Sequence, residues 1–124
     1  MTIQRFEPSQ RRLTLRASDH VAVTPIEAAV LPAGSYLLEL RSHPHPPVRY
    51  PVFLERDRAW TCTPLDADAP LPIWLPPAEE LGPDDIYIPA GPFMSGGDPR
   101  AVEGLMPDRP WLDAFVIRRF PVTQ

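Results

Sequence analysis

The 19 prolines among 124 residues constrain the fold of this chain more than any other feature. A proline inside a helix removes a backbone hydrogen bond and clashes with the preceding turn, so the sequence argues against long helices. The apolar residues instead occur in short alternating runs, which are typical of half-buried strands. With 44% hydrophobic and 23% charged residues, the composition is that of a globular protein. We therefore predict a folded, mainly β chain.

Charge and cysteine content argue against several classes of partner. The net charge is −4 and the 12 basic residues, all arginines, are scattered along the chain, so we do not expect nucleic acid as a partner. The single cysteine, Cys62, excludes an internal disulfide framework and a cysteine-rich zinc site, and it favours a reducing compartment. No apolar run reaches the ~20 residues of a membrane span, and the first residues lack a signal-peptide core. The sequence predicts a cytoplasmic protein that does not associate with membranes.

The clearest structural unit lies within residues 31–60. A Pro-Ala-Gly turn leads into an alternating run with inward positions at Tyr36, Leu38 and Leu40. After the connection HPHPP, a second run has inward positions at Val48, Tyr50, Val52 and Leu54. We expect these two strands to pair antiparallel. Pro51 has no amide hydrogen, so we expect either that the second strand lies at a sheet edge or that the Pro51 nitrogen points away from the ladder.

Weaker patterns suggest further strands. Leu13 and Leu15 alternate with polar neighbours, and the segment around Val21 and Val23 can form a similar strand. Residues 73–75 form a short apolar run among prolines. Farther along, Ile86 and Ile88 alternate around Tyr87 before a second Pro-Ala-Gly turn and a glycine-rich loop. Finally, residues 111–117 read as a strand that is covered on both faces.

These patterns divide the chain into three parts. Residues 1–60 are expected to form a small antiparallel β-sandwich-like module, and residues 61–84 a proline-rich connector. Residues 85–124 are expected to supply the first strands of an irregular α+β domain. A module of about 60 residues is marginal in stability, so we expect its apolar strand faces to lean on the segment that follows.

The last third of the chain carries an ordered set of motifs: DIYIPAGPFMSGG, then DPR and PDRP, then WLDAFVIRRFPVTQ. In this order and spacing it resembles the beginning of the formylglycine-generating, sulfatase-modifying-factor (FGE-sulfatase) domain. The matching positions are Pro89, Ala90, Gly91, Phe93, Met94, Gly96, Asp108, Arg109, Pro110, Asp113, Phe115, Ile117, Pro121, Val122 and Thr123. The resemblance implies that residues 85–124 open an irregular, C-type-lectin-like domain whose remaining polypeptide is not part of this sequence.

Residues 31–60 are similar to the PEGA-like β module found between a serine/threonine kinase domain and a sulfatase-modifying-factor-like domain in some bacterial proteins. The resemblance implies that the complete protein is a metal-dependent, oxidoreductase-like (formylglycine-generating) enzyme or a binding derivative of it. In that family, copper-binding cysteines lie far downstream, and iron-dependent relatives use a histidine cluster. No catalytic, cofactor-binding or metal-binding residue is therefore carried over to this chain, and no cofactor is assigned.

Two functions follow from the sequence. The first is the non-catalytic N-terminal portion of a sulfatase-modifying-factor-like protein, whose partner is the remainder of its own domain. The second is a stand-alone β binding or scaffold module that engages a protein partner through a sheet edge. No small-molecule ligand is assignable from the residues.

Several residue groups are candidate sites. His43 and His45 would point to one side of an extended segment, as joint metal binding requires, but no further ligand is near and a solvated connection is favoured. Cys62 has no neighbouring base, which favours packing over catalysis. The dispersed spacing of five acidic residues favours turn-forming and capping roles over a calcium site. They are Asp84, Asp85, Asp98, Asp108 and Asp113.

The loop SGGDPR, residues 95–100, holds two adjacent glycines, as phosphate-binding loops do. It lacks the GxxxxGK[ST] pattern and a following helix, so a simple turn is the favoured interpretation. Large aromatic residues in a small β protein are usually part of its core, and we expect this of five side chains. They are Trp60, Trp74, Phe93, Trp111 and Phe115.

Overall fold

The computed structural model of the chain describes residues 1–16, 22–24, 26, 28–64 and 66–121. In these residues every strand pairing is antiparallel and the single helical element is one short 3-10 turn. The prediction of a mainly β chain is confirmed. The elements are β1 (Thr2–Ser9), β2 (Arg12–Arg16), β3 (Gly34–Leu40), β4 (Val48–Leu54), η1 (Ala78–Glu80), β5 (Asp85–Ile88), β6 (Gly91–Pro92), β7 (Trp111–Leu112) and β8 (Phe115–Arg118).

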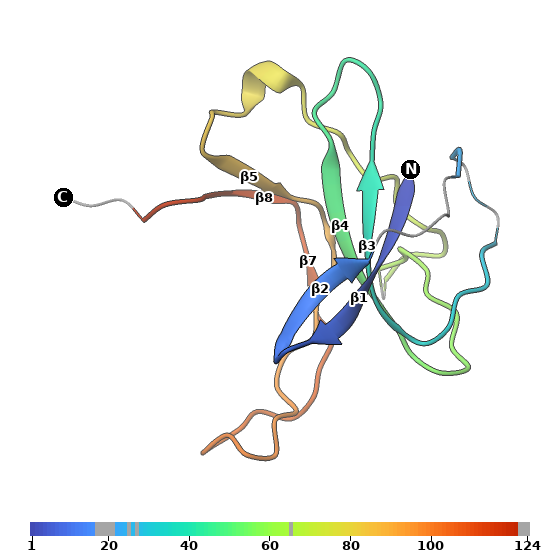
Figure 1. Ribbon diagram of the computed structural model, residues 1–124, viewed down its shortest axis with the longest axis vertical. Coiled ribbons are helices and arrows are strands. Elements are labelled where there is room, and N and C mark those ends of the chain that lie inside the picture. The colour runs from blue at the N-terminus through green and yellow to red at the C-terminus, as the bar shows by residue number, and fades with distance from the viewer. Residues whose placement is uncertain (17–21, 25, 27, 65, 122–124) are drawn as a thin grey trace.

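The main sheet has four strands in the order β2-β1-β3-β4 (Figure 1). A tight turn joins β1 to β2, and its two residues, Gln10 and Arg11, have φ angles of 48° and 65°. Positive φ at both positions is the type I′ geometry that matches the twist of a hairpin. On the other side, β3 and β4 pair from Gly34 opposite Leu54 to Leu40 opposite Val48. β4 therefore lies at the edge of this sheet, which is one of the two arrangements expected from Pro51.

The core lies on one face of this sheet. Tyr36, Val48, Tyr50 and Val52 are each no more than 6% exposed, which confirms four of the predicted inward positions of β3 and β4. The other three predicted inward positions, Leu38, Leu40 and Leu54, are half-buried. Ile3 joins the buried residues because it lies opposite Leu38, which in turn lies opposite Tyr50. On the other face Leu37, opposite Pro51, is also buried at 5% exposure. The sheet is thus covered on both faces at this point.

Residues 84–119 form one bent β-hairpin. Ile88 lies opposite Phe115 in the β5–β8 ladder, Gly91 opposite Leu112 in the β6–β7 ladder, and Ser95 bridges Asp108. Equal numbers of residues separate these positions on the two strands, so the register is continuous and no extra residue is inserted at the bend. Figure 1 shows the β5–β8 arm projecting from the main sheet, while the β6–β7 arm turns away and ends in the loop of residues 96–107.

Three strand predictions are wrong in detail. Residues 22–24, which include Val23, lie outside any strand, and Val21 lies outside the described residues. Residues 73–75 are not part of a strand either, because flanking prolines at 72, 76 and 77 remove the amide donors that a ladder needs. The predicted strand 111–117 is interrupted at residues 113–114, and β8 is exposed along its length rather than covered. No helix in the described residues has the length and apolar character needed to cross a membrane.

Leu37→Ala is expected to lower the free energy of unfolding by about 2–5 kcal/mol, because it leaves a cavity in a covered region. Leu13→Ala is the matched control: Leu13 is 66% exposed on β2, and its loss is expected to cost less than about 0.5 kcal/mol. Urea denaturation followed by circular dichroism measures both. Equal losses would show that Leu37 is not a core residue.

Candidate functional site

Tyr50 of β4 anchors the bent hairpin to the main sheet. Its hydroxyl group donates a hydrogen bond to the carbonyl oxygen of Ala90 at the bend, at 3.1 Å, and lies 3.2 Å from the Sγ atom of Cys62. The rings of Tyr50 and Trp60 pack in an edge-to-face arrangement, with a centroid distance of 5.7 Å and an interplanar angle of 68°. One side chain, only 3% exposed, therefore joins the sheet, residues 60–62 and the hairpin.

Gly91 makes room for this anchor. A Cβ atom at this position would lie 2.3 Å from the Tyr50 Oη atom, closer than real contacts allow. Pro89, two residues earlier, is buried. The Pro-Ala-Gly turn at residues 89–91 therefore has a packing role: its alanine supplies the acceptor and its glycine supplies the space. The expectation that the strand faces lean on the following segment agrees with these contacts.

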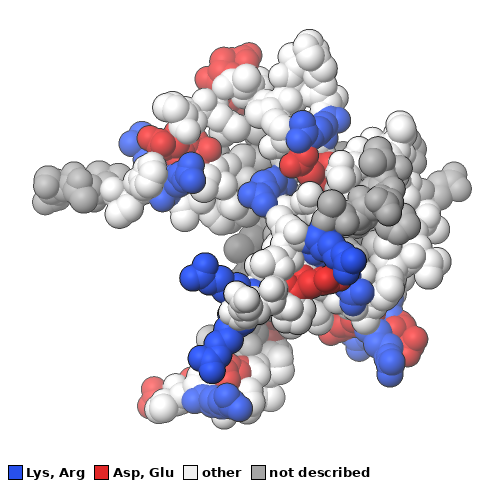
Figure 2. All heavy atoms as spheres, in the orientation of Figure 1, with Lys and Arg blue, Asp and Glu red and all other residues white. Residues whose placement is uncertain are grey.

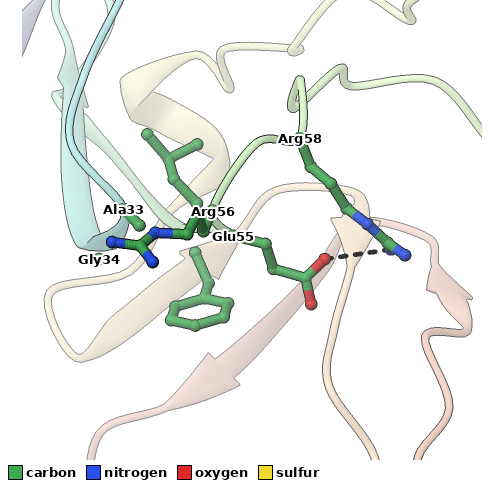
Figure 3. Close-up of a pocket in the computed structure, with 7 residues that line it drawn as sticks. Ala33, Gly34, Glu55, Arg56 and Arg58 are labelled. Carbon is green, nitrogen blue, oxygen red and sulfur yellow. Dashed lines mark ion pairs between the residues drawn. The ribbon is translucent and has the colours of Figure 1, made fainter.

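A second contact is made by Glu55, immediately after β4. Its carboxylate pairs with Arg58 at 3.1 Å and with Arg109, which follows the bridge residue Asp108 of the hairpin. Figure 3 shows the Glu55–Arg58 pair at the shallow hollow also lined by Ala33, Gly34, Phe53, Leu54 and Arg56. Because these side chains are partly exposed, such pairs contribute only about 0–1 kcal/mol each. Of the two pairs, Glu55–Arg109 links the end of β4 to the hairpin.

The proline-rich segment contacts the hairpin and the main sheet. Trp74 packs edge-on against Tyr87 of β5, with a centroid distance of 5.6 Å. Nearby, Pro76 is fully buried, and its carbonyl oxygen lies 3.3 Å from the Nδ1 atom of His45 in the β3–β4 connection. This segment is therefore bound on two sides although it forms no strand.

Burial determines the protonation state of the anchor. Desolvation, and then the hydrogen bond and charge interaction with Cys62, raise the pKa of Tyr50 well above its ordinary value of 10.0. Burial also raises the pKa of Tyr87. A phenol whose neutral form is favoured in this way does not exchange protons near neutral pH. The cluster around Tyr50 is therefore suited to holding structure together rather than to acid–base chemistry.

The two histidines differ in their exposure. His43 is exposed, whereas His45 is half-buried and faces the Pro76 carbonyl group. Cys62 is half-buried against Tyr50, in the packing position expected for it. Within the described ranges, no group of three or more histidine, cysteine, aspartate or glutamate residues lies close enough together to hold a metal ion.

The acidic residues mostly act in turns, as predicted. Each of Asp85, Asp98 and Asp108 accepts a hydrogen bond from a backbone amide within three residues, at 2.7–2.9 Å. Asp84 contributes its carbonyl oxygen, which accepts a hydrogen bond from the Arg119 amide at 2.8 Å. Asp113 is exposed between β7 and β8.

The glycine-rich loop is a turn at the end of the β6–β7 arm. Gly96 and Gly97 have φ angles of 69° and 79°, and a Cβ atom at Gly96 would lie 2.3 Å from the Met106 carbonyl oxygen. Glycine is therefore required there by backbone geometry, and this accounts for the adjacent pair without a phosphate.

The expectation that the large aromatic residues form the core is wrong for three of the five. Trp74, Phe93 and Phe115 are 53%, 42% and 44% exposed. Trp60 and Trp111 are half-buried. The physical reason is that the hairpin projects from the main sheet instead of stacking on it, so the core consists mostly of aliphatic residues and tyrosines of the main sheet.

A second hollow, larger than the one beside Glu55, has a volume of about 1510 Å³. It lies between the inner face of the main sheet and residues 59–62 and 71–75, and its lining is largely apolar. On the face shown in Figure 2, arginines and carboxylates are interspersed rather than gathered by sign. Neither feature identifies a ligand.

Comparisons with known protein families, with curated proteins and with solved structures found no match for this chain. Its resemblance to the sulfatase-modifying-factor domain and to the PEGA-like module therefore stays a prediction. The bent hairpin and its anchor at Tyr50 are the features from which a function can be argued.

Gly91→Ala is expected to destabilise the protein by about 1–3 kcal/mol, because the new methyl group collides with the Tyr50 hydroxyl. Tyr50→Phe alone is expected to cost about 1–3 kcal/mol, because it removes the hydroxyl group that donates a hydrogen bond to the half-buried Ala90 carbonyl oxygen. The double variant should lose less than the sum of the two, because phenylalanine lacks the colliding oxygen. Urea denaturation of all four proteins measures this coupling.

Gly82→Ala is the matched control for this cycle. A Cβ atom at Gly82 would meet only the Asp85 carboxylate, at 3.1 Å, and no atom of Tyr50. Its effect should not change when Tyr50 is replaced by phenylalanine. Strict additivity for Gly91→Ala and Tyr50→Phe would mean that the two residues are not in contact.

The stability of the protein is expected to fall at alkaline pH. The pKa of Tyr50 is raised in the folded state, so its stabilising contribution is fully present below the unfolded-state value of about 10 and is lost as the pH rises above it. Urea midpoints measured between about pH 8 and about pH 11 span the ordinary tyrosine pKa. They should fall more steeply with increasing pH for the wild type than for Tyr50→Phe. Identical slopes would rule out this role of Tyr50.

Proposed function

We propose that residues 85–124 are the opening segment of a formylglycine-generating-enzyme or sulfatase-modifying-factor-like domain, preceded by a PEGA-like module in residues 1–60. In this proposal the chain is a non-catalytic N-terminal portion of a bacterial, kinase-associated multidomain protein. Its support in the sequence is the order of motifs from DIYIPAGP to FPVT.

The observation that carries the proposal is the uncovered apolar face of the β5–β8 arm. Ile86, Phe115 and Ile117 are 43%, 44% and 51% exposed, and the register places them on one face together with Ile88. Apolar strand faces of this kind are normally covered by another layer of the same domain. We propose that this layer is polypeptide that continues the hairpin's own domain.

The matched motif residues have structural roles that fit this proposal. Ala90 and Gly91 hold the bend against Tyr50, and Arg109 pairs with Glu55 at the end of β4. Through these contacts the four-stranded module would serve as a base that fixes the direction of the hairpin. The β5–β8 arm would then present its apolar face to the rest of the domain.

A second candidate function is a binding or scaffold module that acts through a sheet edge. In the described part of the chain, β2 and β8 each pair with a strand on one side only. Such an edge can accept an extended segment of a partner by backbone hydrogen bonding.

The test of the first candidate begins with the coding sequence beyond codon 124. It is expected to stay open and to encode the family's later glycine, tryptophan and cysteine or histidine motifs. In the longer protein, residues 115–118 should exchange their amide hydrogens more slowly than in the 124-residue chain, because the covering layer excludes water. Exchange in β3, already buried, should not change and serves as the internal reference.

A stop codon directly after codon 124, with residues 115–121 of the purified chain resistant to protease, would contradict the first candidate and favour the second. Unchanged exchange at residues 115–118 in the longer protein would also contradict it.

A further inference from the structure

The outer edge of β8 has backbone groups without a strand partner. The Arg119 amide donates to the Asp84 carbonyl oxygen at 2.8 Å, and Asp85 lies opposite Arg118. Because hydrogen-bonded and non-hydrogen-bonded pairs alternate in an antiparallel ladder, Ile117 and Phe115 also direct their backbone groups toward β5. The N–H and C=O groups of the alternate residues therefore point to the other side. Within β8 these residues are Val116 and Arg118.

No strand pairs with this side of β8 in the ranges that the structure describes. All four residues of β8 are exposed. An exposed strand with a row of unpaired backbone groups is a template for another strand. We propose that a second copy of this chain binds here, with the two β8 strands antiparallel and related by a two-fold axis at Val116.

The register of this pairing follows from the backbone directions. In a two-fold arrangement, each outward-pointing residue must lie opposite another outward-pointing residue. An axis at Val116 places Val116 opposite its own copy and Ala114 opposite Arg118 of the second copy. An axis at Phe115 or Ile117 would instead centre the pairing on a residue whose backbone groups already bond to β5.

Charge complementarity argues for a second copy as the occupant. Asp113 lies two residues before β8 and Arg119 one residue after it, so an antiparallel second copy brings the Asp113 end of one strand to the Arg119 end of the other, and the pair is repeated at the other end of the interface. Directly opposed charges of unlike sign stabilise a strand pair, and like charges destabilise it. Asp113 and Arg119 are both exposed, and Arg118 already has a carboxylate, Asp85, 3.9 Å away in its own chain.

This pairing uses the edge of the β5–β8 arm and leaves its apolar face free. Side chains of Ile86, Ile88, Phe115 and Ile117 from the two copies would form one continuous face across the interface. The inference therefore does not rest on the proposed sulfatase-modifying-factor membership, and it holds whether or not another layer packs on that face. The interface is small, so the dimer is expected to be weak.

Sedimentation equilibrium of the 124-residue chain tests the proposal. The apparent mass is expected to rise from 13.9 kDa toward twice that value as the concentration increases to the order of 100 µM. Val116→Pro removes an outward amide without removing a hydrogen bond to β5, so it should remain monomeric over the same range.

Charge-swap variants give a second, independent measurement. Asp113→Arg and Arg119→Asp should each abolish the increase in mass, because each places like charges opposite one another. The double variant D113R/R119D should restore it. Arg100→Asp, in the loop of residues 96–107, makes the same kind of charge change away from β8 and should dimerise as the wild type does. Circular dichroism checks that each variant is folded.

A wild-type chain that stays monomeric throughout this range would overturn the proposal. So would a folded Val116→Pro variant that still dimerises, or a double charge swap that fails to restore the dimer. If Val116→Pro does not fold, the charge-swap series decides. None of these results depends on the coding sequence beyond codon 124, so the failure of this inference and that of the proposed function are distinguishable.

Discussion

The contact between Tyr50 and the bend of the hairpin holds the two parts of this structure together. The phenol ring belongs to the core of the main sheet, while its hydroxyl group binds the carbonyl group of Ala90, forty positions along the chain. Further contacts among the described residues include an exposed ion-pair cluster at Glu55, an edge-on aromatic contact between Trp74 and Tyr87, and the approach of β4 to β5. Exposed ion pairs add little stability, so the direction of the hairpin depends mainly on this one buried side chain and on the absence of a side chain at Gly91.

Because the hairpin is held at its bend, its β5–β8 arm extends from the sheet with both an apolar face and a backbone edge uncovered by described residues. These are two different surfaces. The face is suited to packing against a further layer of polypeptide, and the edge is suited to adding a strand. The proposed function uses the first and the proposed self-association uses the second, so they do not compete for the same groups.

Alternation predicted the inner faces of β3 and β4 and the existence of β5, because a half-buried strand must place apolar side chains at every second position. The same logic missed β1 as an element. Its sequence, TIQRFEPS, has little apolar alternation, and its turn uses Gln10 and Arg11 where glycine or asparagine is usual. Pairing with β3 makes it a strand. The opposite error occurred at residues 73–75, where local pattern favoured a strand but no partner is available between prolines.

Proline content and short-range periodicity were thus sufficient to predict the β class and the antiparallel pairing of neighbouring strands. The turn roles of Asp85, Asp98 and Asp108 were also predictable. Each of these features depends on residues that are close together in the chain. Other features appear only when distant segments meet. They are the continuous register of the hairpin from Asp84 to Asp108, the contact of Tyr50 with Gly91 and the exposure of β8. A glycine in a Pro-Ala-Gly turn looks the same whether its space is occupied by solvent or by a phenol. Folding brings the Tyr50 side chain next to Gly91, and no local sequence pattern predicts this contact.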